Sequence, residues 1–430
     1  MIGSLPFFNA PAVHEGVAIS GNKIILRHKT RTLESAAAQE TNFLLAFQHQ
    51  RDADAFRQQL WEKRSLIEAA VRHCFKLGEG DKCTLLPPQA WLQGGFNLCT
   101  FVDIESRGIA RRVVFRCPMT HKLAERQYPG TLDEKMANEV ATYAWMQQHC
   151  PDIRIPLLYS FAFLGGGHMR PPPATGLAYM ILEHIGPETG QMLSMSWKRY
   201  KDDSERRNRL FQGMTRIMLS IARLPQPHIG AFRFNAADST ITLTNRPLTC
   251  TSIIFENEGA SRAIRPNQMY RTTDSFASDM LTLYDNYYDN YFLHHPHAAL
   301  DEDDARDRTT IRTLLRTVAH HFILPERRDG PFLLQLDDFH QSNIFVDDDW
   351  NVTCLLDLEW ISALPVEAMS VPYWLTDCSI DSVTGDDYKS FADTRRAFLA
   401  AMDDQIKTIN LEHTIPIADI MRQTWDSKAT

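Results

Sequence analysis

The stretch Gln335–Trp360 constrains the fold of this chain more than any other part of its sequence. Two short apolar runs, Ile344–Val346 and Val352–Leu356, flank a turn rich in Asp and Asn. This pattern is typical of an antiparallel hairpin. The hairpin follows an acidic loop and ends on a further carboxylate, so we expect it to carry a site at one end.

Side chains suited to phosphoryl transfer gather at that end. Asp338 lies five residues before Asn343, the D-x-x-x-x-N spacing of phosphoryl-transfer catalytic loops, in which the Asp is the base. A turn centred near Trp350 would place Asn343 directly opposite Asp357, with Cβ atoms roughly 4.5–5.5 Å apart. An amide oxygen and a carboxylate at that separation can share one Mg²⁺. The stretch therefore predicts a base, Asp338, and two metal ligands, Asn343 and Asp357.

Length and composition bound the class of protein. At 430 residues the chain is too long for one ordinary core, which predicts two or three domains. Its 44% hydrophobic and 23% charged residues are typical of a soluble globular protein. The net charge of −8 argues against a nucleic-acid partner, which would need a basic patch. No apolar run approaches the length of a membrane span, so no membrane partner is expected either.

The cysteines and the N-terminus point to the cellular compartment. The N-terminal residues lack a basic region followed by a long apolar stretch, so no secretory signal is expected. The eight cysteines are scattered, without a C-x-x-C pair. We therefore expect a reduced, cytoplasmic protein with free thiols.

Three regions follow from the pattern of apolar residues. Residues 1–80 are predicted to form an N-terminal arm and a helical extension, with helical spacing over Glu34–Phe75. That helical face can bind a partner or pack on the next domain, and packing is the stronger expectation. Residues 81–185 are predicted to form a domain of short strands with one helix. Residues 186–430 are predicted to be mainly helical and to carry the central hairpin.

Within residues 81–185 several features fit a nucleotide site, each with a simpler alternative. Gly94 and Gly95 lie between two strands, where backbone N–H groups can approach phosphate oxygens, although an ordinary hairpin turn has the same pattern. Arg116 ends a predicted strand, and it can pair with phosphates or be a solvated strand-end charge. Glu139 borders the apolar stripe of a helix, from which it can reach Arg116 or remain at the rim.

Taken in order, these elements resemble the aminoglycoside-phosphotransferase-like (choline-kinase-like) branch of the protein-kinase fold, and in particular its fungal phosphotransferase-like group. The resemblance runs from about Cys83 to Leu375. It is carried by the phrases WLQGGFNLC, PGTLDEKMANEVATYAWMQQHCPDIRIP, NRPL, DDFHQSNIFVDDDWNVTCLLDLEW and PYWL. It implies an α+β, bilobal kinase-like fold: an N-lobe antiparallel sheet with one helix and a mainly helical C-lobe, here with an N-terminal helical extension.

The resemblance also implies an activity, transfer of the γ-phosphate of ATP to a small-molecule hydroxyl with Mg²⁺ as cofactor. Asp338 resembles the catalytic base, and Asn343 and Asp357 resemble the Mg²⁺ ligands. Arg116 takes the place of the phosphate-pairing lysine, with Glu139 as its helix partner. The remaining implied contacts are with the nucleotide: the phosphate loop at Gly94 and Gly95, and the adenine beside the backbone of Glu183 and Ile185.

The chain departs from the family pattern at three positions of the predicted site. Leu336 stands where the family usually has a histidine, two residues before the base. Asp337 places a second acid beside Asp338, and it is the alternative base. Arg116 carries a planar guanidinium where the family has the compact charge of a lysine ammonium. These departures support an alternative function, a weak or inactive nucleotide-binding pseudokinase. We expect the acceptor pocket in the helical half, including Asp279–Tyr291 and the segment after Trp360.

Overall fold

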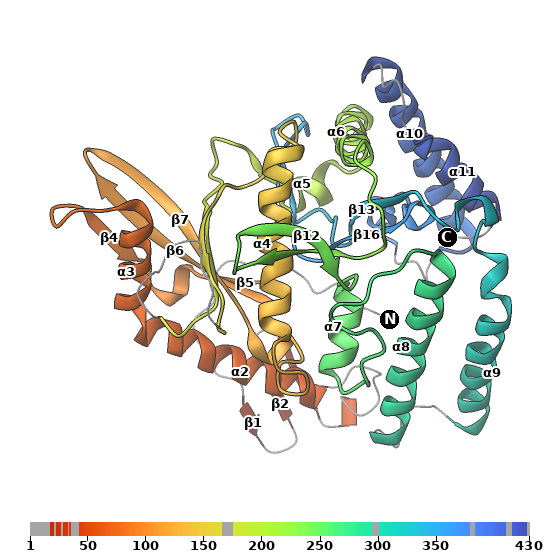
Figure 1. Cartoon of the computed structure of the whole chain (residues 1–430), viewed down its shortest axis with the longest axis horizontal. Helices are drawn as coiled ribbons and strands as arrows, with labels where there is room; N and C mark the ends of the chain where they lie inside the picture. The colour runs from red at the N-terminus through yellow and green to blue at the C-terminus, as the bar shows by residue number, and fades with distance from the viewer. Residues whose placement is uncertain are drawn as a thin grey trace.

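The computed structural model describes residues 18–20, 23–26, 29–32, 34–35, 43–165, 175–294, 301–378, 383–409 and 415–427. A six-stranded antiparallel sheet forms one half of the molecule (Figure 1). Its order is β4-β6-β7-β9-β8, and β5 pairs with β6 beside this path. The strands are β4 (Lys82–Leu85), β5 (Leu92–Gln93), β6 (Asn97–Ser106), β7 (Ile109–Pro118), β8 (Leu158–Ala162) and β9 (Tyr179–Glu183).

Helices cover both faces of this sheet because side chains alternate along its strands. In β9, Met180 and Leu182 face the core shared with α4 (Thr131–His149). Tyr179 and Ile181 face the opposite core, which α2 (Phe43–Glu62) and α3 (Arg64–Phe75) close. The N-terminal helical extension therefore packs on the sheet, as the stronger sequence expectation had it.

α4 lies between the sheet and the helical half of the molecule (Figure 1). Its first turn is capped by the Glu125 carboxylate, which accepts from the N–H groups of Gly130 at 2.7 Å and Leu132 at 2.6 Å. Glu134, in the same turn, binds Arg246 at 2.9 Å, and Arg246 also pairs with Glu256. All three charged side chains are buried, so this network ties the start of α4 to the helical half.

The second half of the molecule is mainly helical, as predicted. Its helices are α5 (Leu193–Tyr200), α6 (Ser204–Ala222), α7 (Cys250–Asn257), α8 (Thr273–His294), α9 (Glu302–Val318), α10 (Gly385–Ile409) and α11 (Ile417–Ser427). Small antiparallel sheets support them: β11 (Ala231–Asn235) with β12 (Thr240–Asn245), β13 (Phe332–Leu336) with β16 (Ile361–Pro365), and β10 (Gln191–Met192) with the central hairpin. The expected α+β class is confirmed.

Short 3-10 helices connect these elements. They are η1 (Pro88–Ala90), η2 (Thr120–Lys122), η3 (Ala319–His321), η4 (Pro325–Arg327), η5 (Val366–Ala368) and η6 (Tyr373–Thr376).

The predicted hairpin is present as β14 (Ile344–Val346) and β15 (Val352–Leu355). Its register differs from the expectation: Asn343 lies opposite Leu356, whose N–H donates to the Asn343 carbonyl at 2.8 Å. The prediction that Asn343 faces Asp357 is therefore wrong. It assumed a turn centred near Trp350 and a regular ladder, whereas the turn closes earlier and the ladder contains a register shift.

The predicted N-terminal arm is described only in part. Its described residues form a three-stranded antiparallel sheet of β1 (Ala18–Ser20), β2 (Lys23–Leu26) and β3 (Lys29–Thr32), and residues 1–17 lie outside the described residues. All eight cysteines are free thiols, as expected. Within the described ranges, every helix is too short or too polar to cross a bilayer.

The Arg246 network makes a prediction about stability. Arg246→Met would leave the buried Glu134 carboxylate without its counter-ion and Glu256 with Arg262 alone, so the free energy of unfolding should fall by about 3–5 kcal/mol. The matched control is Arg306→Ala, which removes an exposed arginine from α9 that is paired within its own helix. That change should cost less than about 0.5 kcal/mol. Urea denaturation measures both, and equal losses would contradict the role of Arg246.

Candidate active site

Arg116 and Glu139 meet in the interior, where the sheet packs on α4. Arg116 lies within β7, paired with Cys99 on one side and Met180 on the other, and it is buried instead of being a solvated strand-end charge. Its Nη2 atom is 3.3 Å from Oε1 of Glu139. Burial by itself lowers the pKa of Arg116, but the Asp357, Glu139 and Glu359 carboxylates outweigh it and raise that pKa. The guanidinium therefore stays charged.

Asp357 also binds Arg116, through a short ion pair between its carboxylate and Nη2. Asp357 has a left-handed backbone (φ 57°), an unusual conformation for a residue with a side chain. It lies two residues beyond β15, so the chain turns there to carry the carboxylate toward β7. The structure thus brings together Arg116, Glu139 and Asp357, three residues that were predicted as site residues from separate segments of the sequence.

Sequence reasoning missed three members of the same cluster, which are Lys135, Glu359 and Asn97. Lys135 Nζ lies 2.5 Å from Glu139 and 2.6 Å from Glu359. Asn97 accepts from Lys135 at 3.1 Å and donates to Glu359 at 2.7 Å. One signal was available: Lys135 and Glu139 are four apart on a helix, a spacing that places them side by side.

The loop before the central hairpin, predicted to be catalytic, holds Asp338 and Asn343 at the end of that hairpin. The Asn343 Nδ2 group donates to the Asp338 carbonyl at 2.9 Å and lies 3.4 Å from its Oδ2. His340 approaches from the other side, with Nε2 3.3 Å from Oδ1 of Asp338. The backbone N–H of Ser342 donates to Nδ1 of His340, so a neutral His340 carries its proton on Nε2. Asp338 is thereby held from both sides.

The environment of Asp338 favours its protonated form. Burial is the main cause, and the negative charges of Asp357, Glu359 and Asp337 add to it, while the hydrogen bond from Asn343 opposes it. Together they raise the pKa of Asp338 to about 7. A general base works best when its pKa lies near the operating pH, so Asp338 has the acidity that the role requires.

Asp337, the alternative base, has a different partner. Its Oδ2 accepts from the N–H of Cys250, the first residue of α7, at 3.2 Å. Burial raises the pKa of Tyr284 in α8, and the nearby charge of Asp337 raises it further. Asp337 therefore belongs to the wall formed by α7 and α8, while Asp338 lies beside Asn343. This geometry favours Asp338 as the base.

Leu336, at the position where the family usually has a histidine, is part of a strand. It pairs with Ile361 in the β13–β16 ladder and packs against the main hydrophobic core. A histidine side chain is thus replaced by a packing residue.

The glycine turn and the connector are less constrained than the charged cluster. The Gly94 N–H donates to the Asn97 carbonyl at 2.8 Å, so it closes the turn and is not available to a phosphate. A Cβ atom at Gly95 would meet nothing within 4 Å. In the connector, the Glu183 carboxylate binds Arg154 at 2.6 Å and its N–H donates to the Leu157 carbonyl. The Glu183 carbonyl lies at the end of β9, and the backbone of Ile185 comes two residues later.

The donor set at the hairpin end suits Mg²⁺. The Asn343 amide turns its NH₂ group toward Asp338, which directs its oxygen away from that residue. With the Asp357 carboxylate it offers the oxygen ligands that Mg²⁺ prefers. The described parts of the chain hold no group of three or more His, Cys, Asp or Glu side chains fit for a metal. Mg²⁺ that is bound partly through substrate phosphates needs only one or two protein carboxylates.

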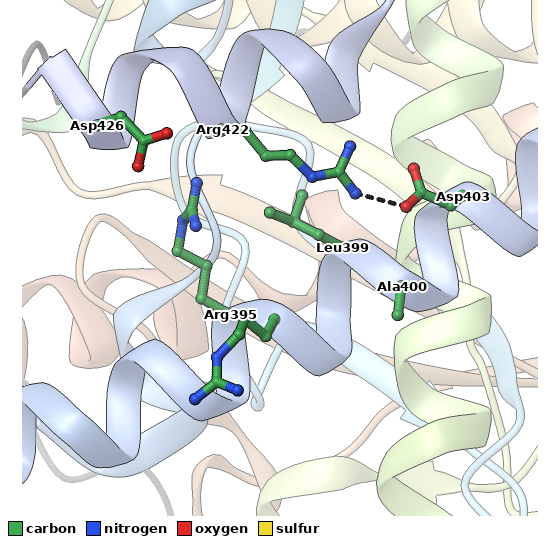
Figure 2. Close-up of a pocket in the computed structure, with 7 residues that line it drawn as sticks. Arg395, Leu399, Ala400, Asp403, Arg422 and Asp426 are labelled. Carbon is green, nitrogen blue, oxygen red and sulfur yellow. Dashed lines mark hydrogen bonds and ion pairs between the residues drawn. The ribbon is translucent and has the colours of Figure 1, made fainter.

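A separate hollow of about 340 Å³ lies between α10 and α11 (Figure 2). Its lining is charged, but Arg422 is paired with Asp403 across it, and Arg395 donates to the Met421 carbonyl. None of the predicted site residues lines it. The hollow is therefore distinct from the catalytic loop.

The sequence profile of the phosphotransferase enzyme family, APH, matches residues 110–362. Because this match covers more than half of the chain, the protein belongs to the APH phosphotransferase family. A search of curated proteins gave no match.

Several solved structures are similar to this chain. A ternary complex of a thermostable mutant of aminoglycoside phosphotransferase APH(4)-Ia with ADP and hygromycin B is 12% identical, with a TM-score of 0.38, covering 85% of this chain and 99% of that one. Macrolide 2′-phosphotransferase type I is 11% identical, with a TM-score of 0.41, covering 86% and 88%. An ethanolamine kinase from Plasmodium vivax is 10% identical, with a TM-score of 0.37, covering 82% and 84%.

The raised pKa of Asp338 makes stability depend on pH. The folded protein holds this proton up to about pH 7, whereas an unfolded chain releases it near 3.8, the ordinary pKa of an aspartate. Ionisation of Asp338 therefore destabilises the folded state, increasingly as pH rises from about 4 to 7. Asp338→Asn removes this effect, so its stability relative to wild type should rise over that range, by on the order of 1 kcal/mol for a partly exposed group. Denaturation at several pH values measures this, and a pH-independent difference would contradict the raised pKa.

Proposed function

We propose that this protein is an ATP- and Mg²⁺-dependent phosphotransferase that moves the γ-phosphate of ATP to a hydroxyl group of a small molecule. Membership of the APH family supports the reaction class. The observation that carries the proposal is the catalytic loop, where Asp338 has a pKa of about 7 and lies beside Asn343.

The proposed chemistry uses Asp338 as the base. Its carboxylate would orient the acceptor hydroxyl and take its proton as the acceptor oxygen bonds to the γ-phosphorus and the bond to ADP breaks. Asn343 and Asp357 would hold Mg²⁺, which when bound supplies charge neutralisation for the phosphates. Arg116 would pair with nucleotide phosphates, with Glu139 behind it. Most of the acceleration would come from positioning and from charge stabilisation.

Residues 81–185 would provide the nucleotide-binding half. The turn at Gly94 and Gly95 would lie over the phosphates, through the Gly95 N–H because that of Gly94 is already bonded. The carbonyl of Glu183 and the backbone of Ile185 would contact the adenine. The acceptor would enter beside Asp337 and Tyr284, on the α7 and α8 side. Eight free thiols support a cytoplasmic setting for this activity.

A nucleotide-binding pseudokinase is the second candidate. One observation favours it: Arg116, the proposed phosphate partner, is bound to Asp357, a proposed metal ligand. The two candidates differ in one measurable respect. Under either, Mg-ATP raises the melting temperature, but only a phosphotransferase releases ADP when it is supplied with hydroxyl-bearing metabolites. The absence of a thermal shift at millimolar Mg-ATP would contradict both.

Asp338→Asn tests the assignment of the base. The variant should lose about 10²- to 10⁴-fold in kcat, since an amide cannot take the acceptor proton, while its thermal shift with Mg-ATP persists. The matched control is Asp337→Asn, which removes the neighbouring carboxylate and should lose less than about tenfold. ADP release measured by a coupled assay gives both numbers. A larger loss in Asp337→Asn than in Asp338→Asn would reverse the assignment.

A further inference from the structure

The buried charge cluster contains more groups than a phosphate-pairing arginine and its helix partner require. It holds two cations, Arg116 and Lys135, and three carboxylates, those of Glu139, Glu359 and Asp357. The lysine and both glutamates have side chains at most 4% exposed. Buried carboxylates are strongly unfavourable unless they are paired. The way the two cations are shared therefore decides which of the three carboxylates keep a counter-ion.

Lys135 is fixed between the two glutamates. Its ammonium group contacts both at 2.5–2.6 Å, and the Asn97 side-chain oxygen accepts a further bond at 3.1 Å. The Trp360 ring lies 5.7 Å from Nζ and helps to enclose it. All three hydrogens of the ammonium therefore have an acceptor within the protein.

Arg116 is held differently. The closest approach to each of three carboxylates is made by one nitrogen, Nη2: a short pair with Asp357 and looser contacts with Glu139 at 3.3 Å and Glu359 at 3.5 Å. Its Nε atom is buried, and in the described structure it has no hydrogen-bond partner. A guanidinium can bind an oxyanion through two nitrogens at once, and the Nε–H of Arg116 is a donor that the described contacts do not use.

We propose that Lys135 is a positioning residue: as the fixed counter-ion of Glu139 and Glu359, it lets Arg116 exchange the Asp357 carboxylate for a nucleotide phosphate. The inference rests on the proposed function, because it assumes that the site binds a nucleotide. If Arg116 were the only cation, its departure would leave two buried glutamates unpaired. With Lys135 in place, those glutamates remain paired, and the Asp357 carboxylate becomes free as Arg116 moves.

Lys135→Met tests this inference through nucleotide affinity instead of turnover. Without the lysine, Arg116 becomes the sole counter-ion of Glu139 and Glu359, so the Kd for ADP with Mg²⁺ should rise about tenfold or more. Titration calorimetry of the full chain, well below the melting temperature, measures it. The matched control is Lys122→Met, which removes a partly buried lysine that contacts His49 away from the site. That variant should lose stability and keep the wild-type Kd.

A second pair of variants guards against misfolding of Lys135→Met. Glu359→Gln removes one carboxylate, so Lys135→Met in that background leaves Arg116 with Glu139 and Asp357, at the same net charge as the wild-type cluster. The Kd for ADP should be several-fold higher in Lys135→Met/Glu359→Gln than in Glu359→Gln alone. Equal Kd values within either folded pair would overturn the inference while leaving nucleotide binding intact. A wild-type protein that does not bind ADP at all would instead overturn the proposed function, and this inference with it.

The exchange itself has a signature in the absence of metal. Asp357→Asn releases Arg116 without Mg²⁺, so ADP in the presence of EDTA should bind at least about threefold more tightly than to wild type. The gain should vanish in Arg116→Met/Asp357→Asn compared with Arg116→Met. A gain that persists without Arg116 would show that removing a negative charge is enough, and would contradict the exchange.

Discussion

The buried ion cluster around Arg116 is the interaction on which the rest of the site depends. It joins β7 and α4 to the segment after β15, which is far from both in the sequence. Charges without solvent are tolerated only with close partners, so the cluster allows little freedom in how these elements lie relative to one another. Asn97 adds the glycine turn to the same unit, because it contacts both Lys135 and Glu359. The sheet half and the mainly helical half are thus joined through charge.

α4 transmits that constraint to the whole molecule. Its apolar face shares one hydrophobic core with the sheet and with the helical half, and its first turn is bound to α7 through Arg246. The second core, closed by α2 and α3, lies on the opposite face of the sheet. The helical extension therefore stabilises the sheet on the face opposite α4. The elements that carry the site are therefore held both by hydrophobic packing and by buried ion pairs.

Much of this could be predicted from local spacing. The hairpin and the five-residue interval from Asp338 to Asn343 follow from strand patterning and motif spacing. Helix geometry allowed Glu139 either to reach inward or to remain at the rim, and only the family resemblance paired it with Arg116. The register of the hairpin could not, because a one-residue shift depends on how the turn closes and how β14 packs beside β10. Lys135 and Glu359 were missed because, in sequence, each is an ordinary polar position. The spacing of Lys135 and Glu139 places them side by side but does not show that they are buried, and Glu359 comes from a distant segment.

The sequence by itself determined the family, the α+β class and the residue types of a phosphoryl-transfer loop, since these are properties of motif and periodicity. Only the tertiary structure decided which groups favour their protonated form and which ions are paired. Burial and long-range neighbours raise the pKa of Asp338, place Asp357 on Arg116 and divide two cations among three carboxylates. Desolvation and Coulomb energy depend on which groups meet in space and how much water is excluded, and spacing along the chain specifies neither.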